Sequence, residues 1–342
     1  MTSFIKMVPA QKKDKFGNMD RKRLIKTIVG WLVAAIIIYI LFKTIYNNRA
    51  QLENWEWKIN WFYTLLSAIT LGAAYFCGSQ GWRAIIYGFG YKIKLHEAFR
   101  VIYLANLGRY IPGKIWQVIG LVGLAKEINI SPAVSMASFA LVEAYALPAS
   151  FILIPLTLGL GQVASTLMVF RDVLYIFMAI VVIIFLILFF RPAGLEWALN
   201  KVLKLFKQES VNYKPSMKNR VSILVWYLLN WSFFGISFHF FLKALIADIR
   251  APIYLTAGAY ITAYVLSYIT FLSPAGLGVR EGIMSAILAT QFGAPVAASI
   301  ALINRVWITI AEVIITLLAL ATYRIKSGKS PGIDAAEKAK SI

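Results

Sequence analysis

Two charged breaks in an otherwise apolar sequence carry residue types that could bind an anion. The clearer break is the segment 273–282, SPAGLGVREG, which separates the strongly apolar runs 254–272 and 283–290. Its proline and glycines are expected to stop a helix. Arg280 and Glu281 come shortly after Gly276 and Gly278. A broken helix with charge at membrane depth persists mainly where it lines a cavity or a site.

An earlier break, the segment 108–114 with the sequence GRYIPGK, repeats this pattern. Arg109 and Lys114 flank Pro112 and Gly113. A helix break frees backbone N–H groups, and a helix that starts at the break points its positive end toward it. Arginine together with free N–H groups is a good receptor for phosphate. The alternative, which applies most to Lys114, is that these cations only anchor hairpin tips at the membrane surface.

Three further charges, Glu143, Arg305 and Glu312, lie deep within apolar runs. Arg305 and Glu312 are seven residues apart, so they share a helix face. Charges at such depth should be paired. We expect Glu143 to pair with Arg305 or Arg109, and Glu281 or Glu312 to pair with another arginine. Such pairs either lock the helices together or act as a gate that exchanges partners or takes up a proton.

The sequence carries no motif of an enzyme. Its two histidines, His96 and His239, are far apart, and its single cysteine, Cys77, lies in an apolar run. No phosphate-binding loop or nucleophile elbow is present, and the glycines at 276–278 follow no strand, so they are no dinucleotide fingerprint. We therefore expect no enzyme and no cofactor. Glu143 and His239 would be the only faint candidates for the base of a membrane-embedded transferase.

Composition places the chain in a membrane. The 342 residues are 60% hydrophobic with a mean hydropathy of +0.70, whereas soluble domains contain roughly 45–50% apolar residues. Several apolar runs exceed the ~18 residues expected of a membrane helix. The net charge of +20 is concentrated in loops, where it indicates orientation and contact with anionic headgroups and not binding of nucleic acid.

We predict an all-α polytopic membrane protein with about six full spans and two broken hairpins, roughly eight to ten helices. The full spans are predicted at 24–46, 61–82, 132–159, 173–190, 223–247 and 295–323. The broken hairpins are predicted at 95–125 and 254–292. The first hairpin has two short helices, and twelve residues cover only about 18 Å of a core roughly 30 Å thick, which favours a re-entrant hairpin over one kinked span or two thin ones. The segments 161–172 and 191–220 are predicted to be exterior and cytoplasmic loops.

The order of these elements predicts an inverted repeat. Tails 1–23 and 326–342 are basic and expected in the cytoplasm, which leaves one transmembrane domain, 24–325, in a cell (inner) membrane. Within it, span, span, broken hairpin and span occur twice with opposite starts, in the pseudo-repeats 24–160 and 168–323. Pro112 and Pro274 are 162 residues apart, as are Glu143 and Arg305. One offset therefore superposes both the breaks and the deep charges.

The segments 108–114 and 274–282 resemble the two signature motifs of the lysylphosphatidylglycerol synthase transmembrane region family, also called flippase-like domain proteins. The resemblance covers about residues 20–325, and the second motif is the more specific. In bifunctional members this region moves aminoacylated phosphatidylglycerol to the outer leaflet, and a cytoplasmic C-terminal domain makes that lipid from aminoacyl-tRNA. The present sequence ends soon after its last predicted span, so lysyl transfer is not expected. The resemblance then implies other lipids, including glycolipids or polyprenyl-linked intermediates.

These observations together predict a lipid translocase for a phospholipid, glycolipid or polyprenyl-phosphate-linked lipid with an anionic headgroup. The residues predicted to bind the substrate are Arg109, Pro112, Gly113, Lys114, Glu143, Gly276, Gly278, Arg280, Glu281, Arg305 and Glu312. The alternative is a non-catalytic partner subunit of a membrane glycosyltransferase or cell-envelope complex, which would use the segment 191–220 and the tails. Without a nucleotide motif, movement would be driven by an ion gradient, a coupled partner or the lipid gradient. The oligomeric state is left open.

Overall fold

A computed structural model describes residues 59–110, 115–166, 171–246, 249–269 and 276–327, with a few isolated positions between 39 and 57. This part of the chain is built of helices, and its only β-type contact is a single bridge between Trp57 and Ile246. The predicted all-α polytopic fold is confirmed. The predicted tail 1–23, most of the predicted span 24–46 and residues 328–342 lie outside the described residues.

The helices follow the predicted order closely. They are α4 (Trp61–Gly88), α5 (Leu95–Ala105), the 3-10 turn η1 (Asn106–Tyr110), α6 (Ile115–Lys126), α7 (Pro132–Thr166), α8 (Arg171–Phe190), α9 (Pro192–Leu205), α10 (Met217–Leu245), α11 (Ile253–Ile269), α12 (Val279–Phe292) and α13 (Ala294–Ser327). Among the described residues, α4, α7, α10 and α13 are each long and apolar enough to cross a membrane. A fifth span is formed if α8 is counted with α9, which is bent from it by 109°.

Two predicted loops are wrong in part. Residues 161–166 continue α7 as helix, because the segment contains no proline and extending an existing helix costs little. The segment 191–220 contains α9, which begins with Pro192 and buries Leu195, Leu199 and Leu203 on one side. Leucines four residues apart give an amphipathic helix. The many lysines of this segment conceal that period when only charge is counted.

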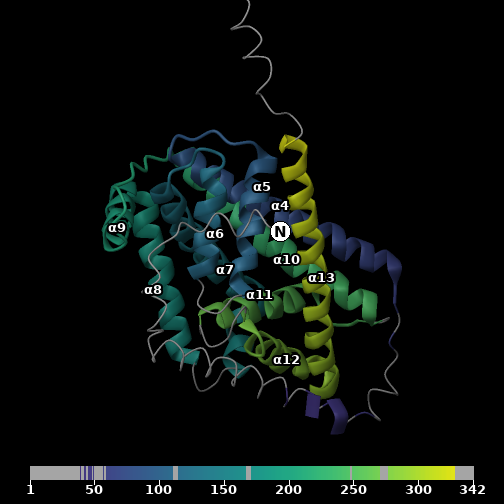
Figure 1. Ribbon diagram of the computed structural model, residues 1–342. Helices are drawn as coiled ribbons and strands as arrows, with labels where there is room; N and C mark the ends of the chain where they lie inside the picture. Colours follow the sequence, from purple (N-terminus) through teal and green to yellow (C-terminus); the bar gives the residue numbers. More distant parts are fainter. Residues whose placement is uncertain are drawn as a thin grey trace, which may run out of the picture.

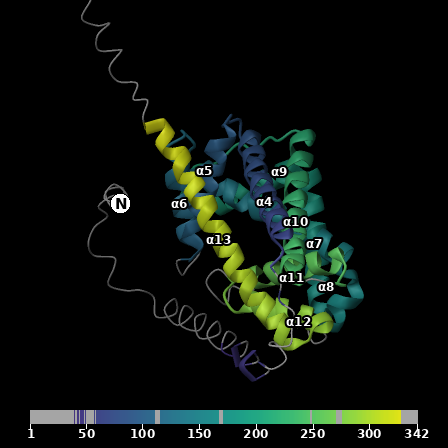
Figure 2. The same ribbon diagram turned by 90° about the vertical axis from the view of Figure 1, so that its right-hand side faces the viewer.

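Close packing of small residues joins α4 to α10, which lie side by side (Figure 2). The Ser67 hydroxyl donates to the Ser237 carbonyl at 2.9 Å, and the Ser237 hydroxyl donates to the Ser67 carbonyl at 2.8 Å. A Cβ atom at Gly81 would lie 3.0 Å from the ring of Tyr227. Membrane helices associate through such small-residue contacts and interhelical hydrogen bonds, since lipid supplies little hydrophobic drive between them.

The other helices make two matching sets of contacts around the central α4–α10 pair. Helix α5 packs against α13, and α11 packs against α7; α6 contacts α7, and α12 contacts α13. Helix α13 runs along one side of the molecule and α8 lies on the opposite side, with α9 across one end of α8 (Figure 1). The two broken segments, α5 to α6 and α11 to α12, thus both contact α7 and α13.

The outward faces of the outer helices are apolar. On α8 the exposed side chains include Ile176, Ile180, Ile183, Ile184 and Ile187, and on α13 they include Val306, Ile310, Val313, Ile314 and Leu317. In water these side chains would form large exposed apolar patches, which soluble proteins rarely have outside interaction surfaces. The surface is the one expected of helices in contact with lipid.

Candidate functional site

A cavity of about 220 Å³ lies where the two broken segments meet, and we call it the polar cavity because charged side chains interrupt its mainly apolar wall. The predicted residues that line it are Arg109, Glu143, Gly276, Arg280, Arg305 and Glu312. Gly278 and Glu281 are not among the lining residues, but Glu281 contacts Arg305, which is one of them. Pro112, Gly113 and Lys114 lie outside the described residues. Side chains that are distant in the sequence thus converge on one space.

The second break positions Arg280 through two glycines with positive φ. Gly276 has a φ of +70° and Gly278 a φ of +78°, a conformation that side chains other than glycine rarely adopt. The resulting turn starts α12 at Val279 and directs Arg280 toward α11. A Cβ atom at Gly276 would also lie 2.8 Å from the Ser267 hydroxyl. Both backbone strain and close packing therefore require glycine there.

Arg280 is a buried cation held between aromatic faces. The residue is 4% exposed, and its guanidinium carbon lies 4.8 Å from the ring centroids of both Tyr260 and Tyr264. Cation–π contacts of this kind stabilise a desolvated arginine, but ring faces accept no strong hydrogen bonds. The Nη2 atom is buried without a hydrogen-bond partner. A buried N–H group in that state is costly.

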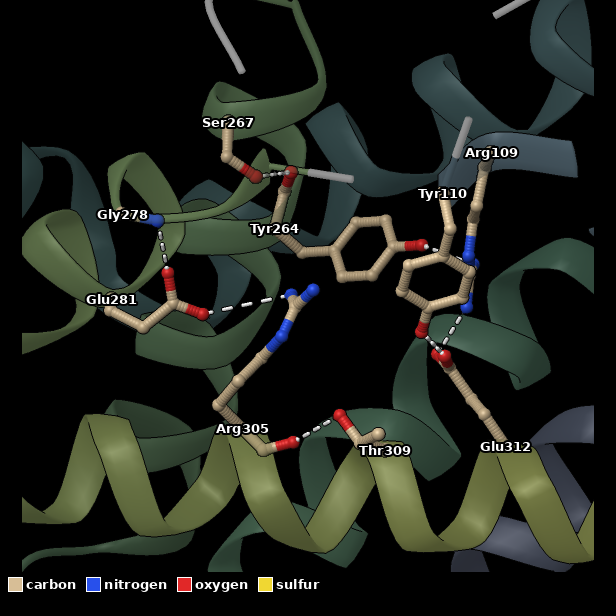
Figure 3. Close-up of polar contacts among 9 residues, drawn as sticks. All are labelled: Arg109, Tyr110, Tyr264, Ser267, Gly278, Glu281, Arg305, Thr309 and Glu312. Carbon is tan, nitrogen blue, oxygen red and sulfur yellow. Dashed lines mark hydrogen bonds and ion pairs between the residues drawn. The ribbon is translucent and has the colours of Figure 1, made fainter. Parts of the chain in front are cut away.

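Glu281 closes the start of α12 and also contacts α13. Its Oε2 atom accepts a hydrogen bond from the Gly278 N–H at 2.7 Å, and its Oε1 atom lies 3.6 Å from Nη1 of Arg305 (Figure 3). This carboxylate therefore offsets both the positive helix end and the Arg305 charge. The expectation that the freed N–H groups of the break face an anion is wrong for Gly278, whose N–H is already taken.

The first break also contacts α13, at Glu312 in the wall of the cavity. The Arg109 guanidinium forms an ion pair with Glu312, and the Tyr110 hydroxyl donates to the same carboxylate. Arg109 also donates to the hydroxyl of Tyr264 at 3.5 Å. Figure 3 shows Arg305 and Glu312 on the same face of α13, each directed toward a different break. Helix α13 thus links both broken segments through charge pairs.

The pairs formed are among those expected from the sequence, namely a carboxylate at 281 or 312 with an arginine. Glu143 lines the same cavity from α7 and interacts with the hydroxyl of Tyr268 on α11. Three arginines and three glutamates are therefore gathered around one space. The arrangement can hold an anion at Arg280 and can exchange that anion against the carboxylates that now neutralise Arg109 and Arg305.

Aromatic residues of the site were missed by the sequence analysis. Tyr260, Tyr264 and Tyr268 lie four residues apart on α11, and the last two line the cavity. That spacing puts them on one helix face, and it was the signal available. Nothing in the sequence pointed to Tyr110, because a tyrosine beside a proline-glycine break is unremarkable by itself.

Two other polar groups have structural roles. The Gln117 side-chain amide donates to Asn106 Oδ1 at 2.7 Å and ties α6 to η1, where a Cβ atom at Gly108 would lie 2.5 Å from the Gln117 nitrogen. His239 lies 3.0 Å from the Thr256 hydroxyl through its Nδ1 atom. It is not among the residues that line the cavity.

The sequence that forms this site matches a known protein family. The family model described as Lysylphosphatidylglycerol synthase TM region matches residues 22–316, a range that includes both breaks and every residue lining the cavity. A search of curated proteins found no match.

Proposed function

The chain belongs to the lysylphosphatidylglycerol synthase TM region family, and from that premise we propose that it is a translocase that moves a membrane lipid with an anionic headgroup between leaflets. The lipid headgroup would occupy the polar cavity while its hydrocarbon chains stay in an apolar environment. The candidate substrates are a phospholipid, a glycolipid or a polyprenyl-phosphate-linked lipid, whose shared feature is a phosphate group. The proposal contains no catalytic step.

The observation that carries the proposal is the state of Arg280. A guanidinium that is buried, fixed by two tyrosine rings and left with an unpartnered Nη2 atom is ready to donate to phosphate oxygens. Hydrogen bonds between arginine and phosphate are charge-assisted and stronger than neutral ones. Because the rings hold the side chain in place beforehand, little side-chain entropy is lost when a phosphate binds.

The two ion pairs on α13 supply a means of passing the headgroup on. Arg109 and Arg305 both line the cavity, and they contact the carboxylates of Glu312 and Glu281, respectively. A phosphate that approaches either arginine can replace that carboxylate if the displaced carboxylate takes up a proton or contacts another cation. Since the pairs join α13 to different broken segments, such an exchange would loosen one contact while the other persists.

The packing of the helices supports the inverted repeat on which this mechanism depends. Exchanging α4 with α10, α5 with α11, α6 with α12 and α7 with α13 maps the α5–α13 contact onto α11–α7, and the α6–α7 contact onto α12–α13. Transporters built from inverted repeats place their substrate at the interface between the halves. The polar cavity takes lining residues from both halves.

The proposal is tested by reconstituting the protein in phosphatidylcholine vesicles that contain a fluorescent phosphatidylglycerol. Movement between leaflets is measured by adding a quencher that reaches only the outer leaflet. We expect Arg280→Ala to slow movement by at least about tenfold, as the loss of a charge-assisted hydrogen bond implies. The matched control is Arg100→Ala, which removes a buried arginine of α5 that does not line the cavity.

The outcome also separates the proposal from its alternative. Unchanged movement in a folded Arg280→Ala protein would remove Arg280 from the site. Wild-type protein that moves no lipid of any headgroup class, but is recovered together with a membrane glycosyltransferase or another envelope enzyme, would favour the partner-subunit function. In both cases size-exclusion chromatography in detergent checks that the variants remain folded.

A further inference from the structure

A second hollow, here called the α7–α8 groove, lies beside the polar cavity and is bounded by α7, α8 and Leu195 of α9. It has a volume of about 240 Å³ and shares Glu143 and Leu147 with the polar cavity. We propose that this groove holds a hydrocarbon chain of the lipid whose headgroup occupies the polar cavity. The inference rests on the proposed function and assigns the part of the substrate that the polar cavity cannot hold.

The chemistry of the groove wall fits a hydrocarbon chain. On α8 the wall consists of Val181, Ile184, Phe185, Leu188 and Phe189, and Leu195 closes it at α9. Carbon atoms make up almost all of this wall, and Glu143 is its single acidic residue. A phosphate would find no basic side chain there to replace its hydration, whereas a chain would lose nothing on moving in from the bilayer.

The wall that the two hollows share is a part of α7 in which the helical hydrogen-bond pattern is interrupted. Pro148 lies inside α7 and has no N–H group to donate to the carbonyl of Ala144, and both residues line the groove. The neighbouring carbonyls are supported from elsewhere: Trp231 Nε1 donates to the Ala146 carbonyl at 2.8 Å, and the Ser150 hydroxyl donates to the Leu147 carbonyl at 2.6 Å. The segment of α7 that contains Pro148 also contributes Glu143 and Leu147, the two residues that the groove and the cavity share.

The dimensions of the groove favour a chain over a protein segment. From Val181 to Phe189 the groove follows about 12 Å of α8, close to the ~15 Å depth of the hydrocarbon in one leaflet. A helix of a partner protein is about 10–12 Å across, too wide for a hollow of this volume. The half-exposed Ile184 forms part of the outer edge, so a chain could pass laterally between α8 and the bilayer.

This arrangement gives Glu143 a defined place. It is the one charged residue that belongs to both hollows, and it contacts Tyr268 on the side of the polar cavity. A lipid with its phosphate at Arg280 and one chain in the α7–α8 groove would therefore pass beside Glu143 with its glycerol or sugar portion. The hydroxyl groups of such a portion are suitable donors to a carboxylate.

Two adjacent residues of α8 provide the test. Ile184 lines the groove and is 51% exposed, while Ile183 does not line it and is 55% exposed. Ile184→Trp should fill the groove, and Ile183→Trp should place the same side chain into the bilayer outside it. Each variant and the wild type are taken from vesicles of phosphatidylglycerol and phosphatidylcholine, and retained lipid is measured by native mass spectrometry alongside lipid movement.

We expect Ile184→Trp to lose at least about tenfold in retained phosphatidylglycerol, because the new ring occupies the space in which the chain would make its packing contacts, while Ile183→Trp keeps the wild-type level. Binding of glycerol 3-phosphate, which has the headgroup charge but no chain, should be equal in all three proteins. Equal lipid retention by the two variants, at any level, would overturn the assignment of the groove. If retention depends on Ile184 but the wild type moves no lipid, the groove stands and the translocase function fails.

Discussion

The guanidinium of Arg109 and the carboxylate of Glu312 form an ion pair that joins the 3-10 turn after α5 to the middle of α13. Neither element could hold its charge in this position alone. The Tyr110 hydroxyl donates to the same carboxylate, so one glutamate accepts from two consecutive residues of the broken segment. The position of the first break is therefore fixed from the opposite half of the molecule.

The first prediction concerns the stability of this pair. Glu312→Gln leaves Arg109 without its counter-charge in a largely buried place, where removing one partner is costly. Because the two side chains are 23% and 15% exposed, we expect a loss of about 2 kcal/mol, less than for a fully buried pair. A double-mutant cycle with Arg109→Gln, followed by thermal unfolding in detergent, measures the coupling. A coupling energy near zero would show that the pair does not hold the break in place.

The second prediction separates charge from shape at Arg280. Arg280→Lys keeps the positive charge but loses the planar group that stacks on Tyr260 and Tyr264. We expect lipid movement to fall by about tenfold or more, as with a lost bidentate contact, while the protein remains folded. Arg83→Lys, outside the cavity, is the control. Full activity of Arg280→Lys would mean that only the charge matters.

The fold was largely predictable because its signals are local. Apolar runs of sufficient length predicted the spans, and prolines and glycines marked both breaks. Deep charges such as Glu143 and Arg305 stood out because membrane interiors rarely contain them. The same rarity singled out residues that the structure gathers around one cavity.

What could not be predicted depends on how the helices are rotated against one another. The choice of Glu312 for Arg109, and of Glu281 for Arg305, follows from the face that α13 turns to each break. The stacking of Arg280 on tyrosines requires α11 and α12 to fold back on each other. The hydrogen bond from the Gly278 N–H to Glu281 is an exception that could have been predicted, since a glutamate at the third helical position commonly caps its own helix.

The third prediction concerns the surface of α9. Its exposed side includes Trp197, with Lys201 above the ring at 4.9 Å, and Lys204. A basic amphipathic helix with an exposed tryptophan is suited to an anionic membrane surface. Changing both lysines to glutamine should lower the unfolding temperature in phosphatidylglycerol nanodiscs, because each lysine contributes about 1 kcal/mol of attraction to an anionic membrane surface. An equal decrease in phosphatidylcholine nanodiscs would contradict this interpretation.

The last prediction concerns Gly276, whose backbone has a φ of +70° and whose added Cβ atom would lie 2.8 Å from the Ser267 hydroxyl and 3.9 Å from the Cβ atom of Arg280. Gly276→Ala should cost about 2 kcal/mol of unfolding free energy through backbone strain, and it should slow lipid movement because the turn positions Arg280. Gly72→Ala, in α4 with no atom within 4 Å of the added carbon, should instead stabilise by about 0.5–1 kcal/mol. Adding Ser267→Ala removes the 2.8 Å contact with the hydroxyl, whereas the 3.2 Å contact with the Cβ atom of residue 267 and the positive φ remain. If the double variant regains full stability, close packing and not backbone conformation is the reason for glycine at this break.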